Sequence, residues 1–360
     1  TKVDRLDYSS DTTTATTKGP LSSARSWGSG TGNTSYGYAG GGNPNGTKID
    51  RLDYASDSST TSPKGNLSQA RYYLGAAGNN SYGYWGAGAA PSESSTVDRV
   101  DFSSDTGTTP TKGPLSLAKR CTGTTGNQSY GYWGAGATSN STPSSSRIDR
   151  IDYSNDTPTA VTKGPLSQAK GYFAATGDTS YGYWGGGSPN TSDIDRLDYS
   201  SDTIATAPKG PLSAATNSFT GAVSSRANAN PTQSSATRSA TQINGSPYGY
   251  YGGGFNPGPS EYSSIERIDY DNDTATAVVK GSMTLVRRQY GATGNTSYGY
   301  NGGGRVSHNT GTSIVDRIDY SSDSSTTSPK GPLSIATHSY PAAVGNASYG
   351  YWGGGKTGSP

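Results

Sequence analysis

The sequence predicts an all-β fold, a seven-bladed β-propeller, and two observations support this. One cassette of about fifty residues recurs seven times along the chain, and each copy contains four short segments with strand character. Repeats of this length are typical of propellers, solenoids and arrays, and four strands per repeat are typical of a propeller blade. We therefore predict a single domain over 1–360 with four antiparallel strands in each blade.

The first segment of each copy has the pattern of a strand that is buried on both faces. Over 3–8 the order is Val-Asp-Arg-Leu-Asp-Tyr, and apolar side chains fall on both faces, as in a strand between neighbouring sheets. A Ser-Ser-Asp-Thr turn follows, and the small β-branched residues of 12–17 suit a short outer strand that ends at Lys18-Gly19-Pro20.

The second half of each copy predicts two further strands. We expect a strand over 24–29, a hairpin at Gly32-Asn33 and a strand over 35–40, in which Tyr36 and Tyr38 share one face. Glycine within a strand marks close approach of another group, so we expect each equivalent of Gly37 to receive an aromatic ring from the next sheet. The Gly-Gly-Gly run that follows indicates a tight blade junction.

The two ends of the chain complement each other. The chain begins with the Asp-Arg-Leu-Asp-Tyr strand and ends after the Tyr-Gly-Tyr-Trp strand, whereas every internal copy has the second of these strands before the first. N- and C-terminal strands are therefore expected to form one composite blade, which closes the ring without a free edge.

Composition narrows the possible functions. Only 29% of residues are hydrophobic, so the 27 tyrosines are expected to supply much of the buried apolar surface. The net charge of +2 comes from 28 basic and 26 acidic residues spread along the chain, which argues against a nucleic-acid partner. No apolar stretch approaches 18 residues, which argues against membrane insertion.

Two repeated positions are assigned a structural role between blades. An arginine follows the first aspartate of each copy, and a tyrosine follows the glycine of each Tyr-Gly-Tyr box. These residues are Arg5, Arg51, Arg99, Arg150, Arg196, Arg267 and Arg317, with Tyr38, Tyr84, Tyr132, Tyr183, Tyr250, Tyr300 and Tyr351.

Repeated aspartates and lysines leave alternatives open. Asp4, Asp7 and their equivalents either pair with the arginines while Asp11 caps a turn, or the acidic cluster binds calcium, although no calcium-binding sequence pattern is present. The lysines at the Lys18 position are either solvated turn residues or a ring that binds an anionic glycan or phosphate.

Irregular segments predict one variable rim. The segments after the glycine runs differ in length and content, over 43–48, 89–96, 137–147, 188–193, 255–264 and 305–314, and a long exposed loop is expected over 221–242. The residues expected to contact a ligand or partner there are Asn43, Glu93, Asn140, Asn190, Phe255, Tyr262 and His308.

The repeats resemble those of the kelch family of β-propellers. The order of Tyr84-Trp85-Gly86, the 97–102 strand, Asp105, Pro114 and Lys119 is similar to the kelch pattern, except that small residues stand at the kelch tryptophan. The Asp-Tyr-Ser-Asn-Asp-Thr, Lys-Gly-Pro-Leu-Ser and Ser-Tyr-Gly-Tyr boxes more closely resemble repeats in structural proteins of tailed phages that infect marine cyanobacteria. This resemblance implies a virion component outside the capsid interior.

From these observations we expect a non-enzymatic structural or adhesive propeller of an extracellular particle, a tailed-phage virion. Its expected partners are other virion or surface proteins and host glycans. The alternative is a carbohydrate-binding module of a secreted or cell-surface protein, with equivalent pockets in several blades. No catalytic, cofactor or metal residues are assigned, because His308, His338 and Cys121 lie in different copies and no nucleophile elbow is present.

Overall fold

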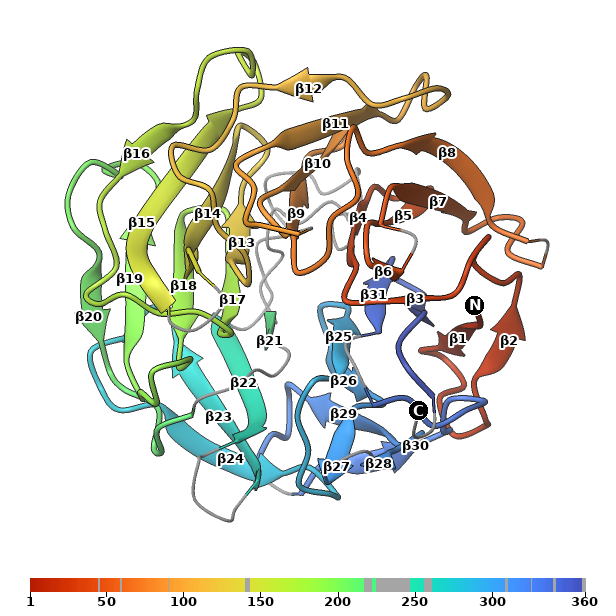
Figure 1. The fold of residues 1–360 in the computed structure, drawn as a ribbon. Coiled ribbons are helices and arrows are strands. Elements are labelled where there is room, and N and C mark those ends of the chain that lie inside the picture. The colour runs from red at the N-terminus through yellow and green to blue at the C-terminus, as the bar shows by residue number, and fades with distance from the viewer. Residues whose placement is uncertain are drawn as a thin grey trace, which may run out of the picture.

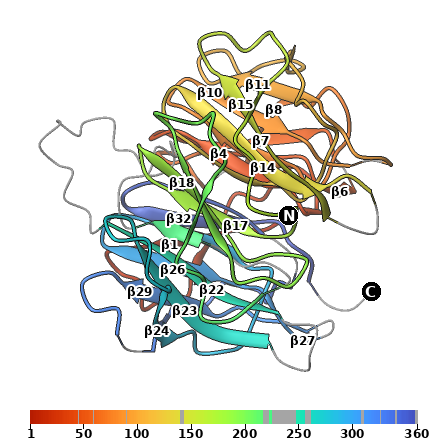
Figure 2. The ribbon, with the colours of Figure 1, turned by 90° about the vertical axis from the view of Figure 1, so that its left-hand side faces the viewer.

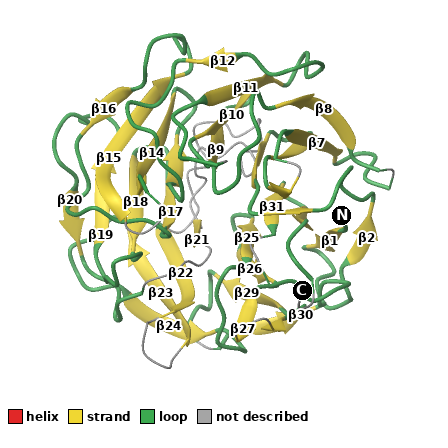
Figure 3. Cartoon of the chain, viewed as in Figure 1, coloured by secondary structure: helices red, strands yellow, loops and turns green. Residues whose placement is uncertain are grey.

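The computed structural model is a closed ring of β-sheets, described over 1–44, 46–58, 60–89, 91–139, 143–216, 222–224, 247–255, 261–307, 310–324, 326–338 and 341–357. Within these ranges the chain forms seven four-stranded antiparallel sheets around one axis, and Figure 3 shows strands and loops without a helix. Figure 1 views the ring along its axis, and Figure 2 shows it from the side. The predicted seven-bladed β-propeller is confirmed.

Each blade runs from an inner strand beside the axis to an outer strand on the circumference (Figure 1). The inner strands are β4 (Ser29–Gly32), β9 (Gly75–Gly78), β13 (Gly123–Gly126), β17 (Ala174–Gly177), β21 (Ala222–Ser224), β25 (Gly291–Gly294) and β31 (Ala342–Gly345). The second strands are β5 (Tyr36–Gly40), β10 (Tyr82–Gly86), β14 (Tyr130–Ala137), β18 (Tyr181–Gly185), β22 (Tyr248–Phe255), β26 (Tyr298–Gly302) and β32 (Tyr349–Gly353).

The outer half of each blade comes from the Asp-Arg-x-Asp box and the lysine segment. The third strands are β1 (Val3–Asp7), β7 (Lys48–Asp53), β11 (Val97–Asp101), β15 (Pro143–Asp152), β19 (Ile194–Asp198), β23 (Glu261–Asp269) and β29 (Val315–Asp319). The outer strands are β2 (Thr16–Lys18), β8 (Ser62–Asn66), β12 (Thr111–Lys112), β16 (Val161–Lys163), β20 (Ala207–Lys209), β24 (Val278–Ser282) and β30 (Ser328–Lys330). Two short ribbons pair β3 (Arg25–Ser26) with β6 (Asn43–Pro44), and β27 (Arg305–Ser307) with β28 (Thr310–Gly311).

The composite blade forms as the sequence predicts. Its strand order is β2-β1-β32-β31, and the register pairs Val3 with Gly353 and Asp7 with Tyr349. The N- and C-terminal strands therefore contribute two strands each to one sheet. This pairing leaves neither terminal strand without a neighbour and closes the ring.

Two local expectations are wrong. The strand expected over 24–29 begins only at Ser29, because Trp27 has a φ of 62° that breaks the extended backbone. The ring next to Gly37 comes from Tyr54 of the same sheet, whereas the ring from the next sheet lies on Gly40. A Cβ on Gly40 would come within 2.7 Å of Cε2 of Trp85.

The tryptophans fit one blade against the preceding one. Indole Nε1 of Trp85 donates to the carbonyl oxygen of Ser29 at 3.1 Å, and Trp133 donates to Gly75 at 3.2 Å. Trp85, Trp133 and Trp184 are fully buried, and Trp352 is 2% exposed. Large rings that lie on glycine therefore join the blades at the junctions of these four tryptophans.

A second set of contacts joins the blades at the end of the molecule opposite the rim. The aspartate of each turn between the third and outer strands accepts hydrogen bonds from an arginine, a lysine and a tyrosine of the preceding blade. These acceptors are Asp11, Asp57, Asp105, Asp156, Asp202, Asp273 and Asp323.

The distances are nearly the same around the ring. Among the described residues, the arginine and tyrosine donors lie 2.7–2.9 Å from the carboxylate, and the lysine nitrogens lie 2.9–3.4 Å away. Each such tyrosine also stacks on the aromatic residue that directly follows the third strand of the next blade, at 4.6–5.2 Å between ring centroids.

These clusters place all seven predicted arginines and tyrosines against the next blade, but with a different partner from the expected one. Asp11 and its equivalents accept the arginine, whereas Asp7 caps the turn by accepting from Ser9 N at 2.9 Å. The lysines do not form a free anion-binding ring, because each is paired with the same aspartate; their side chains keep 8–20% exposure to solvent.

Candidate functional site

The variable loops and the segments that precede the inner strands lie at the same end of the ring. In each blade the backbone before the inner strand pairs with a neighbouring rim loop: Arg25 pairs with Pro44, and Lys119 pairs with Ser94. The glycine runs allow this approach. Gly42 (φ 107°) donates its N–H to the carbonyl oxygen of Arg71 at 2.8 Å, and a Cβ there would lie 2.7 Å from the Ser26 oxygen.

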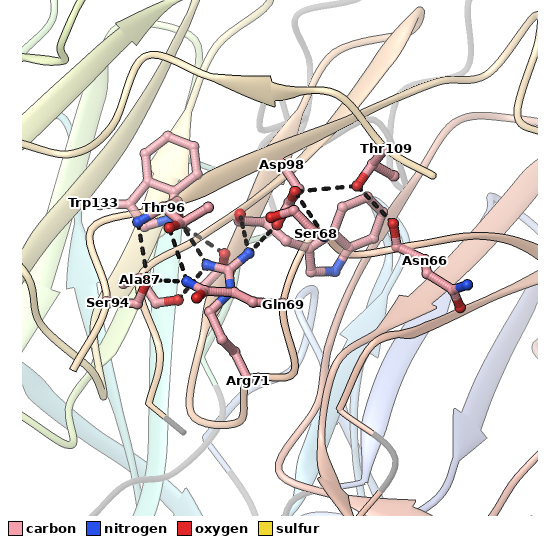
Figure 4. Close-up of polar contacts among 12 residues, drawn as sticks. Asn66, Ser68, Gln69, Arg71, Ala87, Ser94, Thr96, Asp98, Thr109 and Trp133 are labelled. Carbon is pink, nitrogen blue, oxygen red and sulfur yellow. Dashed lines mark hydrogen bonds and ion pairs between the residues drawn. The ribbon is translucent and has the colours of Figure 1, made fainter. Parts of the chain in front are cut away.

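Buried cations anchor this end of the scaffold. Arg71 is fully buried, forms an ion pair with Asp98 and donates to the carbonyl oxygens of Ala87 at 2.6 Å and Thr96 at 2.7 Å (Figure 4). The same arrangement joins Arg25 to Asp50, Lys119 to Asp149, Lys170 to Asp195 and Arg287 to Asp316. Because the cation ties the rim loop to the third strand, it fixes the direction in which the loop leaves the sheet.

Two blades depart from this arrangement. Thr216 and Thr337 occupy the position of the cation. In the blade of Thr216 the acidic residue is Glu266, which is 4% exposed and accepts from the backbone N–H of Ser213. Burial raises the pKa of the Glu266 carboxyl. Asp4, in the composite blade, accepts from Ser334 N at 3.1 Å and from the Thr17 hydroxyl at 3.2 Å.

Four consecutive blades place a distinct residue at the axial end of the inner strand. Trp27, Tyr73, Cys121 and Tyr172, here called the axial cluster, each have a φ between 55° and 62°. Their backbones are linked from blade to blade: Tyr73 N donates to Trp27 O, Cys121 N to Tyr73 O and Tyr172 N to Cys121 O, at 3.1, 2.9 and 3.3 Å. These hydrogen bonds stabilise a left-handed backbone conformation that is unfavourable for residues other than glycine.

The aromatic rings of the axial cluster converge. Trp27 stacks on Tyr73 with centroids 5.0 Å apart, and Tyr73 meets Tyr172, two blades further on, edge to face at 6.2 Å. Contact between blades that are not neighbours shows that these side chains lie close to the axis. Together with Leu74, Thr122 and Phe173 they line an open cavity of about 140 Å³.

The cavity is neutral. Its lining contains rings, an aliphatic side chain, a thiol and hydroxyls, but no charged side chain. Burial raises the pKa of the Cys121 thiol to about 12, so the sulfur stays protonated at neutral pH. Arg120 lies beside the cavity, 6.0 Å from the Tyr73 centroid, and is paired with Glu93 at 3.5 Å.

The predicted rim residues are spread over several loops. Asn43 and Asn190 are exposed, and Glu93 is half-buried in its pair with Arg120. The ring of Phe255 lies under the guanidinium of Arg288 at 4.0 Å, and Tyr262 is half-buried. Asn140 and His308 lie outside the described residues, as does most of the loop expected over 221–242.

In the part of the chain that the structure describes, no three His, Cys, Asp or Glu side chains gather closely enough to hold a metal ion. No helix in that part has the length and apolarity needed to cross a membrane. His338 is buried, 5% exposed, and its backbone N–H bonds to Lys356 O.

Comparison with known proteins identifies the fold alone. No protein-family model matches the sequence, and no curated protein matches it. Among solved structures, the chain is similar to the structure of YjhT, with a TM-score of 0.61 and 11% sequence identity over 87% of this chain and 99% of that one. At this identity the likeness supports the propeller architecture and carries no assignment of activity.

Proposed function

We propose that this chain is a non-enzymatic structural and adhesive propeller of an extracellular particle, a tailed-phage virion, and that its rim contacts other virion proteins or the host surface. The observation that carries this proposal is the contrast between the two ends of the ring. One end repeats the same aspartate cluster in all seven described blade junctions. The rim end differs from blade to blade in loop length, anchoring cation and axial residue.

Such a division suits a scaffold that presents variable loops. A regular set of junctions makes the ring rigid, and loops held on a rigid scaffold are a common location of binding residues. The virion assignment rests on the resemblance of the repeats to those of tailed-phage structural proteins, and a kelch-like relationship rests on the order of motifs.

The virion assignment is tested by the protein content of particles. Phage particles produced from the genome that encodes this chain would be purified by density and digested for mass spectrometry. Peptides of the chain are expected at a constant ratio to the major capsid protein across the particle peak. Detection of the chain in the lysate but not in the particle peak would contradict the proposal.

A carbohydrate-binding module is the second candidate. It is favoured by the aromatic cavity at the axial end, which lies on the same side of the molecule as the variable loops. The alternative expected from sequence, with equivalent pockets in several blades, fits less well, because the aromatic residues of the repeats are used in junctions between blades.

A further inference from the structure

We propose that the cavity of the axial cluster is a binding site for one uncharged sugar ring. This inference rests on the proposed function, that the chain binds rather than catalyses. The placement of four side chains is the first argument. The left-handed backbone recurs at this position wherever the structure describes it, Gln289 included, and at Trp27, Tyr73, Cys121 and Tyr172 it brings the side chain to the lining of one cavity.

Size and lining limit the ligand. The cavity of about 140 Å³ lies well below the ~300–1,000 Å³ of pockets for drug-sized molecules, so it suits a single ring. Aromatic faces pack against the C–H faces of a pyranose, while the hydroxyl of Thr122, which is buried and has no hydrogen-bond partner among the described residues, can bond to one of its O–H groups.

Aromatic residues bind both cations and sugars, and the charges around the cavity indicate which class of ligand fits. An aromatic cage for a quaternary ammonium ion needs an environment that favours positive charge. Here no carboxylate lines the cavity, so no fixed negative charge would balance a bound cation. An acidic sugar needs an available basic group, but Arg120 is already paired with Glu93. A neutral ring is the class that remains.

The tryptophans provide a direct reporter. Of the five tryptophans, Trp85, Trp133, Trp184 and Trp352 are buried, and Trp27 alone is partly exposed. Fluorescence that acrylamide quenches therefore comes mainly from Trp27. A ligand in the cavity should lower the quenchable fraction. From the binding free energy per non-hydrogen atom that is typical of small ligands, the Kd for one sugar ring is expected to be on the order of 1 mM.

The experiment titrates the intact chain with glucose, galactose and N-acetylglucosamine, and in parallel with choline and N-acetylneuraminate. At least one neutral sugar is expected to protect Trp27, and the two charged compounds are not. Tyr73→Gly should weaken binding roughly tenfold, because it removes a stacking surface while its backbone suits glycine. Gln289→Gly is the matched control, since Gln289 has a φ of 59° at the equivalent position but does not line the cavity.

Failure of all three neutral sugars to protect Trp27, or tighter protection by choline or N-acetylneuraminate, would overturn the sugar site. Equal weakening by Tyr73→Gly and Gln289→Gly would also overturn it, because the effect would then be general to the axial backbone. These outcomes are separate from the particle test. If the chain is present in particles but binds none of the sugars, the proposed function stands and the sugar site is wrong.

Discussion

At the scale of single residues, one aspartate per junction does most of the joining. Its carboxylate receives three donors from the preceding blade, and the donor arginine also lies over the first tyrosine of the Tyr-Gly-Tyr box at 3.9–4.6 Å. Net stabilisation by a buried ion pair is small, but loss of one partner leaves the others buried and unpaired. The aspartate should therefore be costly to remove.

Asp105→Ala is expected to lower the free energy of unfolding by about 3 kcal/mol, because it orphans Tyr38, Arg51 and Lys64. The matched control is Asp101→Ala in the same turn, which removes only local hydrogen bonds to Ser103 and should cost about 1 kcal/mol. Denaturant unfolding of the two variants provides the measurement. Equal losses would show that the shared acceptor is not what holds the junction.

Glu266 gives the chain a pH dependence of definite sign. Burial raises its pKa in the folded state above that in the unfolded state, so ionising it opposes folding. The penalty is absent below the unfolded-state pKa and grows as pH rises through the folded-state pKa. Glu266→Gln should therefore stabilise the protein at neutral pH, and this advantage should vanish near pH 4.

Unfolding midpoints of the Glu266→Gln variant and the parent at several pH values test this. Asp316→Asn is the matched control, because Asp316 at the equivalent position is paired with Arg287 at 2.7 Å. The control should be destabilised at neutral pH. A Glu266→Gln variant less stable than the parent at pH 7 would contradict the account.

At the scale of elements, the space around the second glycine of each second strand is set by the blade that follows. A Cβ on Gly86 would lie 2.8 Å from Nε1 of Trp133, and one on Gly134 would lie 2.6 Å from Nε1 of Trp184. Gly353 differs, because Ala39 stands where the blades of Gly134 and Gly185 have Trp133 and Trp184, and the nearest neighbour of a Cβ on Gly353 would be Val3 at 3.2 Å. At the same position of the repeat, a Cβ would therefore clash with the next blade in one junction and fit in another.

Gly86→Ala is expected to cost about 2 kcal/mol by displacing Trp133, as overpacking in a filled core does. Gly353→Ala, its counterpart in the composite blade, should cost less than about 1 kcal/mol. Thermal unfolding followed by tryptophan fluorescence compares the two. A larger loss at Gly353 would mean that ring-on-glycine contact does not set the fit between blades.

The elements show what the sequence could predict. Seven copies of the Asp-Arg-x-Asp and Tyr-Gly-Tyr boxes predict blade number, strand content and closure, because these follow from periodicity and from the order of boxes at the ends. The partner of Arg5 was missed, because Asp57 lies in the following copy and only the angle between neighbouring blades brings them together. The same holds for Lys18.

The axial cluster was missed for a different reason. Its residues, Trp27, Tyr73, Cys121 and Tyr172, differ between copies and lie where a strand was expected, so no repeated pattern marks them. The available signal was a concentration of aromatic residues just before the inner strands of neighbouring copies. That signal does not show that the side chains meet, because their direction towards the axis depends on the left-handed backbone, which the sequence alone does not reveal.

At the scale of the whole molecule, the contacts that repeat between blades and the loops that vary lie in different parts of the ring. Aspartate clusters and aromatic stacks repeat around it, and the Asp11–Arg317 contact, 306 residues apart in the chain, has the same geometry as the others. The glycine runs, the buried cations and the axial cluster lie at the other end, where neighbouring blades differ. Binding is therefore expected at the rim end, and the turns around Asp11 and its equivalents should stay free.

Hydroxyl-radical footprinting of the chain within intact particles, compared with the free chain, tests this claim most directly. Protection is expected at peptides that contain Asn43, Glu93 and Asn190 and at the ring of Trp27. Peptides that contain the opposite turns, at Ser10, Ser56 and Ser104, should remain as reactive as in the free protein. Protection of those turns together with an unchanged rim would contradict the account.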